Sequence, residues 1–375
     1  MFLDVFKDAQ AAVNQSQKTY DLHLRGLANG NGNANGSSKL PADHPEAVAA
    51  TTQWAALRST SIQAHTEVFP DMEILDEYDQ PFDFHVLPVE GTLPFASSFT
   101  DTTFIVERDF YPSIMDIVKT HAGGQYRILL RGAPGIGKSG AIGAYVLHGV
   151  GQLMNAEGEQ CRIKRVVLSS PQSKSKVYNL DGTVDILTDD KQFETLACLS
   201  DAVWLMDEEE HGPFLDARGV TCLVASADPE NYNTYWKKAQ RLCWVANWDS
   251  NGRMSKEGLP LELEALIRVL NAANVCDVTI PRAVEHFYIA GALPRDIIED
   301  PGRAKKQINR IVCKLSMEDV QKLTAKHADL IDAHLNHRLA NPYVNRETME
   351  EDDSTLVIAS EYVRQLLLQK QNAGD

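Results

Sequence analysis

A glycine-rich segment between Gly132 and Gly140 has the residue types and the spacing that bind phosphate groups. Its sequence, GAPGIGKSG, contains the pattern G-x-x-x-x-G-K-[ST]. Glycines let main-chain N–H groups turn toward an anion, the lysine reaches the terminal phosphate oxygens, and the hydroxyl binds a divalent cation. The residues expected to line this phosphate loop are Gly132, Ala133, Pro134, Gly135, Ile136, Gly137, Lys138, Ser139 and Gly140.

Two acids follow a short apolar run in the stretch AVWLMDEEE, which resembles the second (Walker B) motif of enzymes that have such a loop. A carboxylate at the end of a buried strand can hold Mg²⁺, and the next acid can orient or deprotonate an attacking water. We therefore expect Ser139 and Asp207 to bind the metal. Lys138 and Glu208 are the expected catalytic residues in a reaction of a nucleoside triphosphate.

Two polar residues further along the chain are candidates for contact with the terminal phosphate. Ser226 ends an apolar run, and it would lie beside the loop if its strand neighbours the loop strand; the alternative is that Ser226 or Asp228 caps a helix. Arg295 follows Pro294 in a GALPR stretch. A cation in the first turn of a helix opposes the helix dipole, which indicates an anionic neighbour; the alternative is an ordinary surface arginine.

The elements that must position these residues alternate between strand and helix. Short, mostly apolar strands indicate burial on both faces, as in a parallel sheet between helices. We predict an α/β fold, a P-loop NTPase with a doubly wound parallel sheet and a helical lid. The predicted strands are 126–130, 165–169, 202–206, 221–225 and 242–246, with a helix at 138–151 and another after a strand or turn near 104.

The chain divides into three predicted parts. Residues 1–94 form an irregular N-terminal extension with a helix in 1–27 and a flexible Asn/Gly linker at 28–39; residues 95–250 form the P-loop core; residues 251–375 form the lid and C-terminal helices. Ser316 and Asp319 fit a capping box. After residue 251 we expect helices at 260–273, 283–289, 305–315, 317–339 and 355–369, the last two separated by the acidic run 347–354.

Composition limits the partners and the compartment. The chain of 375 residues has 52 acidic and 36 basic residues, a formal charge of −16, which argues against nucleic acid as the main partner. Six scattered cysteines indicate reduced, mostly buried thiols in an intracellular compartment, cytoplasmic or nuclear. The start MFLDVFKDAQ does not have the pattern of a secretory signal, and no run is long and apolar enough to span a membrane.

The ordered motifs resemble one family. The stretches FIVERDFYPSIMDIV, RGAPGIGKS, VWLMDEE, SADPENYNTYWKK, LCWVANW and GALPR are similar to the NTPase domain of Crinkler-type effectors and retrotransposon hot spot proteins, over residues 103–300. The resemblance implies Mg²⁺ and ATP, an AAA-like or signal-transduction ATPase fold, and sensor roles for Ser226 and Arg295. Asn247 and Ala292 depart from the family pattern, and no arginine finger is evident.

These observations favour an ATPase whose lid movement couples to a protein partner or to self-association. ATP is preferred because the Asn-Lys-x-Asp box of GTP-binding proteins is missing. The alternative is a nucleotide-dependent regulatory binding module with little turnover. We expect no nuclease centre after residue 251, because the sequence there contains no Asp/Glu-x-Lys triplet.

Overall fold

The computed structural model describes residues 39–89, 104–170, 173–188, 190–207, 216–226, 232–248, 252–299, 301–325, 338–345 and 348–374. These residues belong to one compact unit that begins at Lys39. The helix expected in residues 1–27 and residues 28–38 of the expected linker lie outside the described residues. The boundaries at 94 and 250 stay predictions.

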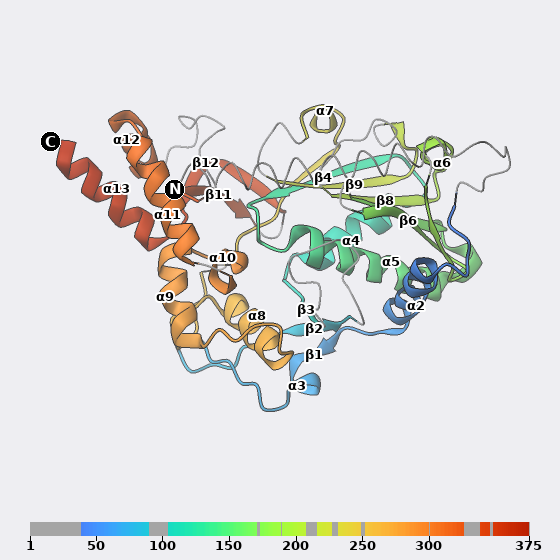
Figure 1. The fold of residues 1–375 in the computed structure, drawn as a ribbon, viewed down its shortest axis with the longest axis horizontal. Helices are drawn as coiled ribbons and strands as arrows, with labels where there is room; N and C mark the ends of the chain where they lie inside the picture. The colour runs from blue at the N-terminus through green and yellow to red at the C-terminus, as the bar shows by residue number, and fades with distance from the viewer. Residues whose placement is uncertain are drawn as a thin grey trace, which may run out of the picture. The chain divides into compact units, whose positions relative to one another are not determined.

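A central sheet carries the fold, as the sequence predicts (Figure 1). Among the described residues it has seven strands in the order β10-β4-β9-β8-β5-β6-β7, of which the first five are parallel. Strands β6 and β7 extend it in antiparallel fashion, which the apolar patterns did not predict. The bounds are β4 Tyr126–Gly132, β5 Arg165–Ser170, β6 Ser173–Asn179, β7 Val184–Ile186, β8 Ala202–Asp207, β9 Val220–Ser226 and β10 Arg241–Trp244.

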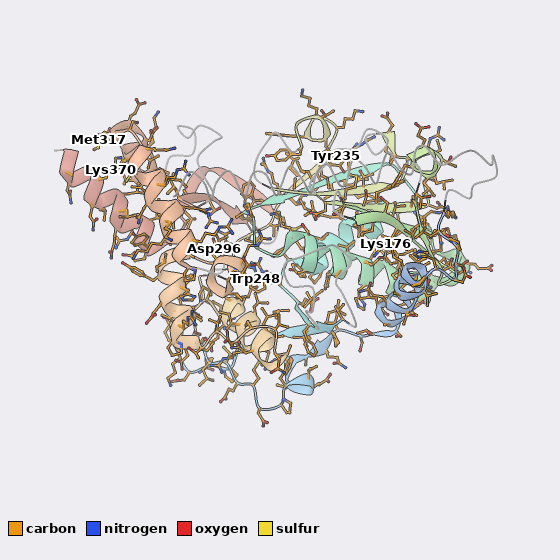
Figure 2. All side chains as sticks on the ribbon, in the orientation of Figure 1. Lys176, Tyr235, Trp248, Asp296, Met317 and Lys370 are labelled. Carbon is orange, nitrogen blue, oxygen red and sulfur yellow. The ribbon has the colours of Figure 1, made fainter. Side chains whose placement is uncertain are left out.

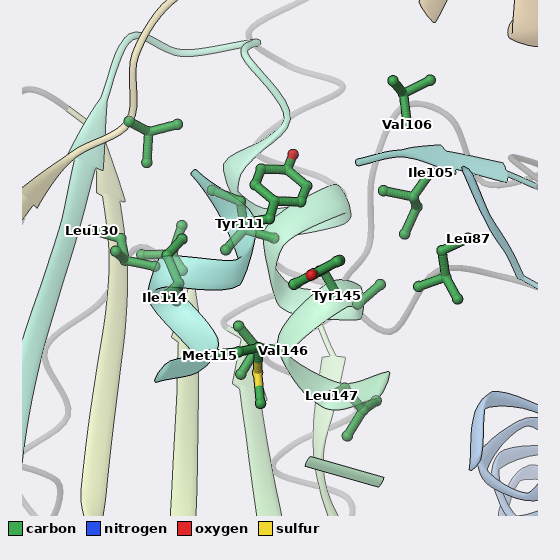
Figure 3. Packing of buried hydrophobic residues seen from close by; sticks show 14 of the residues in the cluster. Leu87, Ile105, Val106, Tyr111, Ile114, Met115, Leu130, Tyr145, Val146 and Leu147 are labelled. Carbon is green, nitrogen blue, oxygen red and sulfur yellow. The ribbon is translucent and has the colours of Figure 1, made fainter. Parts of the chain in front are cut away.

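Helices cover both faces of the sheet, so the fold is doubly wound. In Figure 1, α4 and α5 lie on one face of the sheet, and α6 and α7 lie on the other. Figure 3 shows the first face, where Tyr111 and Ile114 of α4 and Val146 of α5 pack near Leu130 of the sheet. The second face buries a separate cluster that includes Trp204 and Tyr235. The bounds are α4 Tyr111–Thr120, α5 Gly143–Glu157, α6 Asp190–Ala197 and α7 Asn233–Trp236; the short 3-10 helix η2 is Gly158–Gln160.

The segment before the core is more regular than the sequence suggests. Helix α2 packs on α5, and a small antiparallel sheet of order β1-β2-β3 leads toward the core. Trp54 of α2 is fully buried, and its indole N–H donates to the carbonyl oxygen of Asn179 at 3.0 Å. The bounds are α2 Pro45–Ser59, β1 Gln63–Ala64, α3 His65–Val68, β2 His85–Pro88 and β3 Phe104–Val106.

The C-terminal part contains helices, as expected, but also a hairpin. The helix expected at 317–339 is described only as far as Thr324, and residues 326–337 are not described; Ala340 already begins a strand. The helix expected from residue 355 begins instead at Glu361, because residues 350–358 pair with β11. The bounds are α8 Leu261–Ala272, α9 Ile280–Ala290, α10 Pro294–Ile298, α11 Pro301–Lys314, α12 Met317–Thr324, β11 Ala340–Asn345, β12 Glu350–Ile358 and α13 Glu361–Gly374.

One predicted helix-end signal, the capping box, is confirmed. Ser316 accepts from the main-chain N–H of Asp319, and the Asp319 side chain accepts from the main-chain N–H of Ser316, which is the predicted capping box. At the end of α9, Gly291 has a φ of +69°, and a Cβ there would overlap the carbonyl oxygen of Ala359. Close packing at this glycine therefore joins the end of α9 to the segment between β12 and α13.

The cysteines and the apolar character of the helices can be compared with what composition predicted. All six cysteines are free; Cys161, Cys222 and Cys243 are buried, whereas Cys198 and Cys313 are exposed, so half rather than most of the thiols are buried. Within the described ranges, no helix combines the length and the apolar character that a membrane crossing requires.

Candidate phosphate-binding site

The glycine loop connects strand β4 to the first turn of the following helix. Gly135 and Gly137 have φ values of +86° and +91°, a region that residues with a Cβ rarely adopt. A Cβ at Gly132 would lie 2.8 Å from the carbonyl oxygen of Val245, so the segment after β10 leaves no room for a side chain there. The loop ends in the π-helical turn η1, Lys138–Ile142, which continues into α5.

Lys138 is buried inside the loop. Its ammonium group donates to the carbonyl oxygens of Gly132 at 2.9 Å and Ala133 at 2.8 Å. These bonds hold the positive charge against the main chain of the loop, and the turn η1 begins at the same residue. A helix N-terminus and a buried cation favour the same ligand, an anion such as phosphate.

Ser139 and Asp207 meet although they lie in different elements. The hydroxyl of Ser139 donates to the carboxylate of Asp207, 68 positions further along the chain. The contact follows from the sheet order, because β9 separates β4 from β8 and aligns their carboxyl ends: Gly132 pairs with Ser226, and Asp207 pairs with Val224. The expected metal-binding pair is therefore assembled.

The oxygens of Ser139 and Asp207 suit Mg²⁺. This cation prefers hard oxygen ligands, and it is bound through one or two carboxylates together with waters and substrate phosphates. In the described part of the chain no group of three or more His, Cys, Asp or Glu side chains could hold a metal by itself. Ser139 and Asp207 are thus the two described side chains that could bind a metal at this site.

The other two predicted residues at the strand ends are only partly described. The main chain of Ser226 ends β9 directly beside Gly132, which is the neighbouring-strand position that the sequence suggested. Glu208 follows Asp207 in the chain and lies outside the described residues. The catalytic role of Glu208 and the sensor role of Ser226 stay predictions.

Arg295 lies in the first turn of α10 and contacts the loop. A Cβ at Gly135 would lie 2.9 Å from the Cβ of Arg295, and the main-chain nitrogen of Arg295 lies 3.5 Å from the carbonyl oxygen of Gly135. The side chain of Arg295 remains exposed. Helix α10 therefore begins against the phosphate loop, and the next residue, Asp296, binds Arg338 through both carboxylate oxygens.

Two residues at this site had no role in the sequence analysis. Trp248, labelled in Figure 2, donates its indole N–H to the carbonyl oxygen of Ile136 in the loop at 3.0 Å. Arg108 is fully buried with its guanidinium 4.6 Å from the centre of the Trp248 ring. Both residues occur in the stretches that carried the family resemblance, and that was the only signal for them.

A separate cavity of about 260 Å³, lined in part by Arg108, lies on the side of the small N-terminal sheet. Its lining includes Phe82, His85, Glu107 and Glu262, and no residue of the glycine loop contributes to it. The cavity is therefore distinct from the phosphate loop.

A parallel strand that ends in this glycine loop, with a hydroxyl bound to a strand-end aspartate two strands away, defines a P-loop nucleoside triphosphatase fold. The loop also occupies the place where ligands bind in such sheets. Helix α5 follows β4 and covers one face of the sheet, whereas α7 follows the neighbouring strand β9 and covers the other face. The chain therefore leaves these two adjacent strands toward opposite faces.

No family model and no curated protein matches the chain. Among solved structures, it is similar to the RuvB Holliday junction branch migration motor of Thermotoga maritima, with 12% identity and a TM-score of 0.32, over 55% of this chain and 63% of RuvB. A point mutant of that RuvB matches at 11% identity and a TM-score of 0.32, over 61% of this chain and 72% of the other. The ORC2 protein of Aeropyrum pernix matches at 10% identity and a TM-score of 0.29, over 76% and 97%. The fold assignment rests on the strand order and the loop.

Proposed function

We propose that this chain binds ATP with Mg²⁺ and hydrolyses it, and that the resulting lid movement couples to a partner. The observation that carries the proposal is the bond from the Ser139 hydroxyl to the Asp207 carboxylate, beside a loop that buries Lys138. Phosphoryl transfer depends mainly on positioning and on neutralising charge, and these three side chains supply groups of the required kinds.

Each residue has a distinct task in the proposed reaction. The loop N–H groups and Lys138 bind the β- and γ-phosphates, and Glu208 orients or deprotonates the attacking water. Ser226 and Arg295 contact the γ-phosphate from the neighbouring strand and from the lid. Ser139 and Asp207 hold the Mg²⁺, which neutralises negative charge on the phosphates when it is bound.

The finer assignment is that the domain is related to the NTPases of Crinkler-type effectors and retrotransposon hot spot proteins. Its support is the order of the sequence motifs, from Arg108 through the loop to Arg295. ATP rather than GTP is the proposed substrate because the Asn-Lys-x-Asp box is missing.

The test is nucleotide binding by calorimetry and steady-state phosphate release by the purified chain with Mg²⁺ and ATP or GTP. Lys138→Ala should abolish tight binding, whereas Glu208→Gln should bind ATP without turnover. Glu209→Gln, one position further along, is the matched control and should keep the wild-type rate. A wild-type rate in Glu208→Gln would show that Glu208 is not the catalytic acid.

A regulatory binding module with little turnover is the second candidate. The observation that favours it is the direct chain of contacts from the loop through Arg295 to Asp296 and on to Arg338, because such a chain lets a bound nucleotide bias the lid position without hydrolysis. Tight nucleotide binding with negligible phosphate release would support this candidate over the ATPase.

A further inference from the structure

Arg108 is the centre of a buried polar cluster beside the phosphate loop. Its exposed fraction is 0%, and its guanidinium donates to the Glu262 carboxylate at 3.2 Å and to the carbonyl oxygens of Ala246 at 2.7 Å and Asn247 at 2.6 Å. The cluster thus joins the segment before α4, the segment after β10 and the first turn of α8.

Aromatic rings hold the same guanidinium from its faces. The ring centre of Phe110 lies 4.7 Å from the guanidinium carbon, and that of Trp248 lies 4.6 Å from it. The guanidinium is planar: its edge donates hydrogen bonds and the aromatic rings contact its faces. It therefore has little freedom to rotate. The position of the Trp248 ring is therefore coupled to that of Arg108.

Net stability does not explain this arrangement well. Desolvation of a buried ion pair offsets most of its Coulomb attraction, so a pair such as Arg108 and Glu262 contributes little compared with apolar side chains of similar volume. What the cluster does provide is a fixed geometry. The fixed part, residues 246–248, includes Trp248, which contacts the phosphate loop.

Trp248 transmits that geometry to the loop. Its indole N–H donates to the carbonyl oxygen of Ile136, between the two left-handed glycines, and its ring is 2% exposed. The preceding Val245 closes on Gly132, the first loop residue, and its main-chain N–H donates to the carbonyl oxygen of Arg131 at 2.7 Å. One side of the loop therefore rests on the segment that Arg108 fixes.

We propose that Arg108 is a positioning residue for the phosphate loop, acting through Trp248, which holds the Ile136 carbonyl in place. The consequence for nucleotide binding rests on the proposed function, but the consequence for the free loop does not. Without this contact, the loop samples conformations in which its N–H groups no longer converge on one point, and only a fraction of molecules is competent to bind phosphate.

The chain offers a matched control. Trp54 has the same chemistry at a distant position: its indole N–H donates to the Asn179 carbonyl oxygen at 3.0 Å, Arg58 lies 5.5 Å from its ring centre, and the ring is fully buried. Trp248→Phe and Trp54→Phe each remove one indole donor and retain an aromatic ring. General destabilisation should therefore be similar in the two variants.

The first measurement is hydrogen exchange of the nucleotide-free protein. Loop peptides that cover residues 132–140 should exchange about tenfold faster in Trp248→Phe than in the wild type, and they should be unchanged in Trp54→Phe. Arg108→Lys should give the same result as Trp248→Phe, because a lysine keeps the charge but cannot reproduce the planar set of bonds. Unchanged loop exchange in Trp248→Phe would overturn the proposal.

The second measurement is the Kd for ATP with Mg²⁺. Trp248→Phe should bind ATP about tenfold more weakly, whereas Trp54→Phe should bind it like the wild type. In the Trp248→Phe background, Arg108→Lys should cause little further loss of affinity, since it acts through the same contact. The route through Trp248 would be overturned if Trp54→Phe weakened ATP binding as much as Trp248→Phe does. It would also be overturned if the effects of Arg108→Lys and Trp248→Phe on the Kd were fully additive. If the wild type binds no nucleotide, the ATPase proposal fails, but the hydrogen-exchange measurement still tests whether Arg108 positions the loop.

Discussion

Substitution of Gly135 by alanine tests the contact between the loop and the lid. The added methyl group would lie 2.9 Å from the Cβ of Arg295, whereas ordinary contact begins at 3.4 Å. Helix α10 must therefore withdraw by about half an ångström. Misplacement of a reacting constellation by an ångström can lower rates by about a hundredfold, so a displacement of this size should lower the ATP turnover number by about tenfold.

The backbone strain of this substitution can be measured separately. Gly258 has a φ of +88°, close to the +86° of Gly135, and a Cβ there meets nothing within 4 Å. An alanine at either position costs about 1–2 kcal/mol for its left-handed conformation. Gly258→Ala should therefore lower the free energy of unfolding by this amount and leave turnover unchanged.

The assay is denaturant unfolding of both variants together with phosphate release. In an Arg295→Gly background the obstructing Cβ is absent, so the stability cost of Gly135→Ala should fall to that of Gly258→Ala. Arg295→Ala retains that Cβ and should give no relief. Equal costs of Gly135→Ala in the wild-type and Arg295→Gly backgrounds would refute the contact, and a turnover loss in Gly258→Ala would refute the separation of strain from displacement.

Three other perturbations have expected outcomes. Burial lowers the pKa of His148, so the unfolded chain binds a proton at higher pH than the folded chain does. The free energy of unfolding should therefore fall as pH drops below about 6.5, by at most about 1.4 kcal/mol per pH unit. Denaturant unfolding between pH 5.5 and 7.5 should show this slope, and His148→Asn should remove it. Asp296→Asn should lower the free energy of unfolding by about 1–3 kcal/mol, because the side chains of Asp296 and Arg338 are only 11% and 16% exposed. A double-mutant cycle with Arg338→Gln should give a coupling energy of similar size, and zero coupling would mean that the pair does not join α10 to the segment before β11. Ser316→Ala removes the capping box and should cost about 1 kcal/mol in thermal unfolding, whereas an unchanged melting temperature would show that the cap contributes nothing.

The apolar strands could be predicted from sequence because they are buried on both faces. Runs such as 202–206 carry that burial in their composition, and β8 and β9 end within one residue of the predicted positions. The strands β6 and β12 were missed for the opposite reason. Their sequences SKSKVYN and EEDDSTLVI begin with polar runs, and their partners in the sheet or hairpin, rather than their composition, make them strands.

The phosphate loop is what the sequence determined by itself. Its nine residues are consecutive, so their types and spacing already specify the turn, the lysine and the hydroxyl. The tertiary structure decided which distant groups meet there. The carboxylate of Asp207 reaches Ser139 only because β9 lies between β4 and β8, and the indole of Trp248 reaches Ile136 across 112 positions of the chain. Strand order and packing bring such residues together, and no local pattern encodes either.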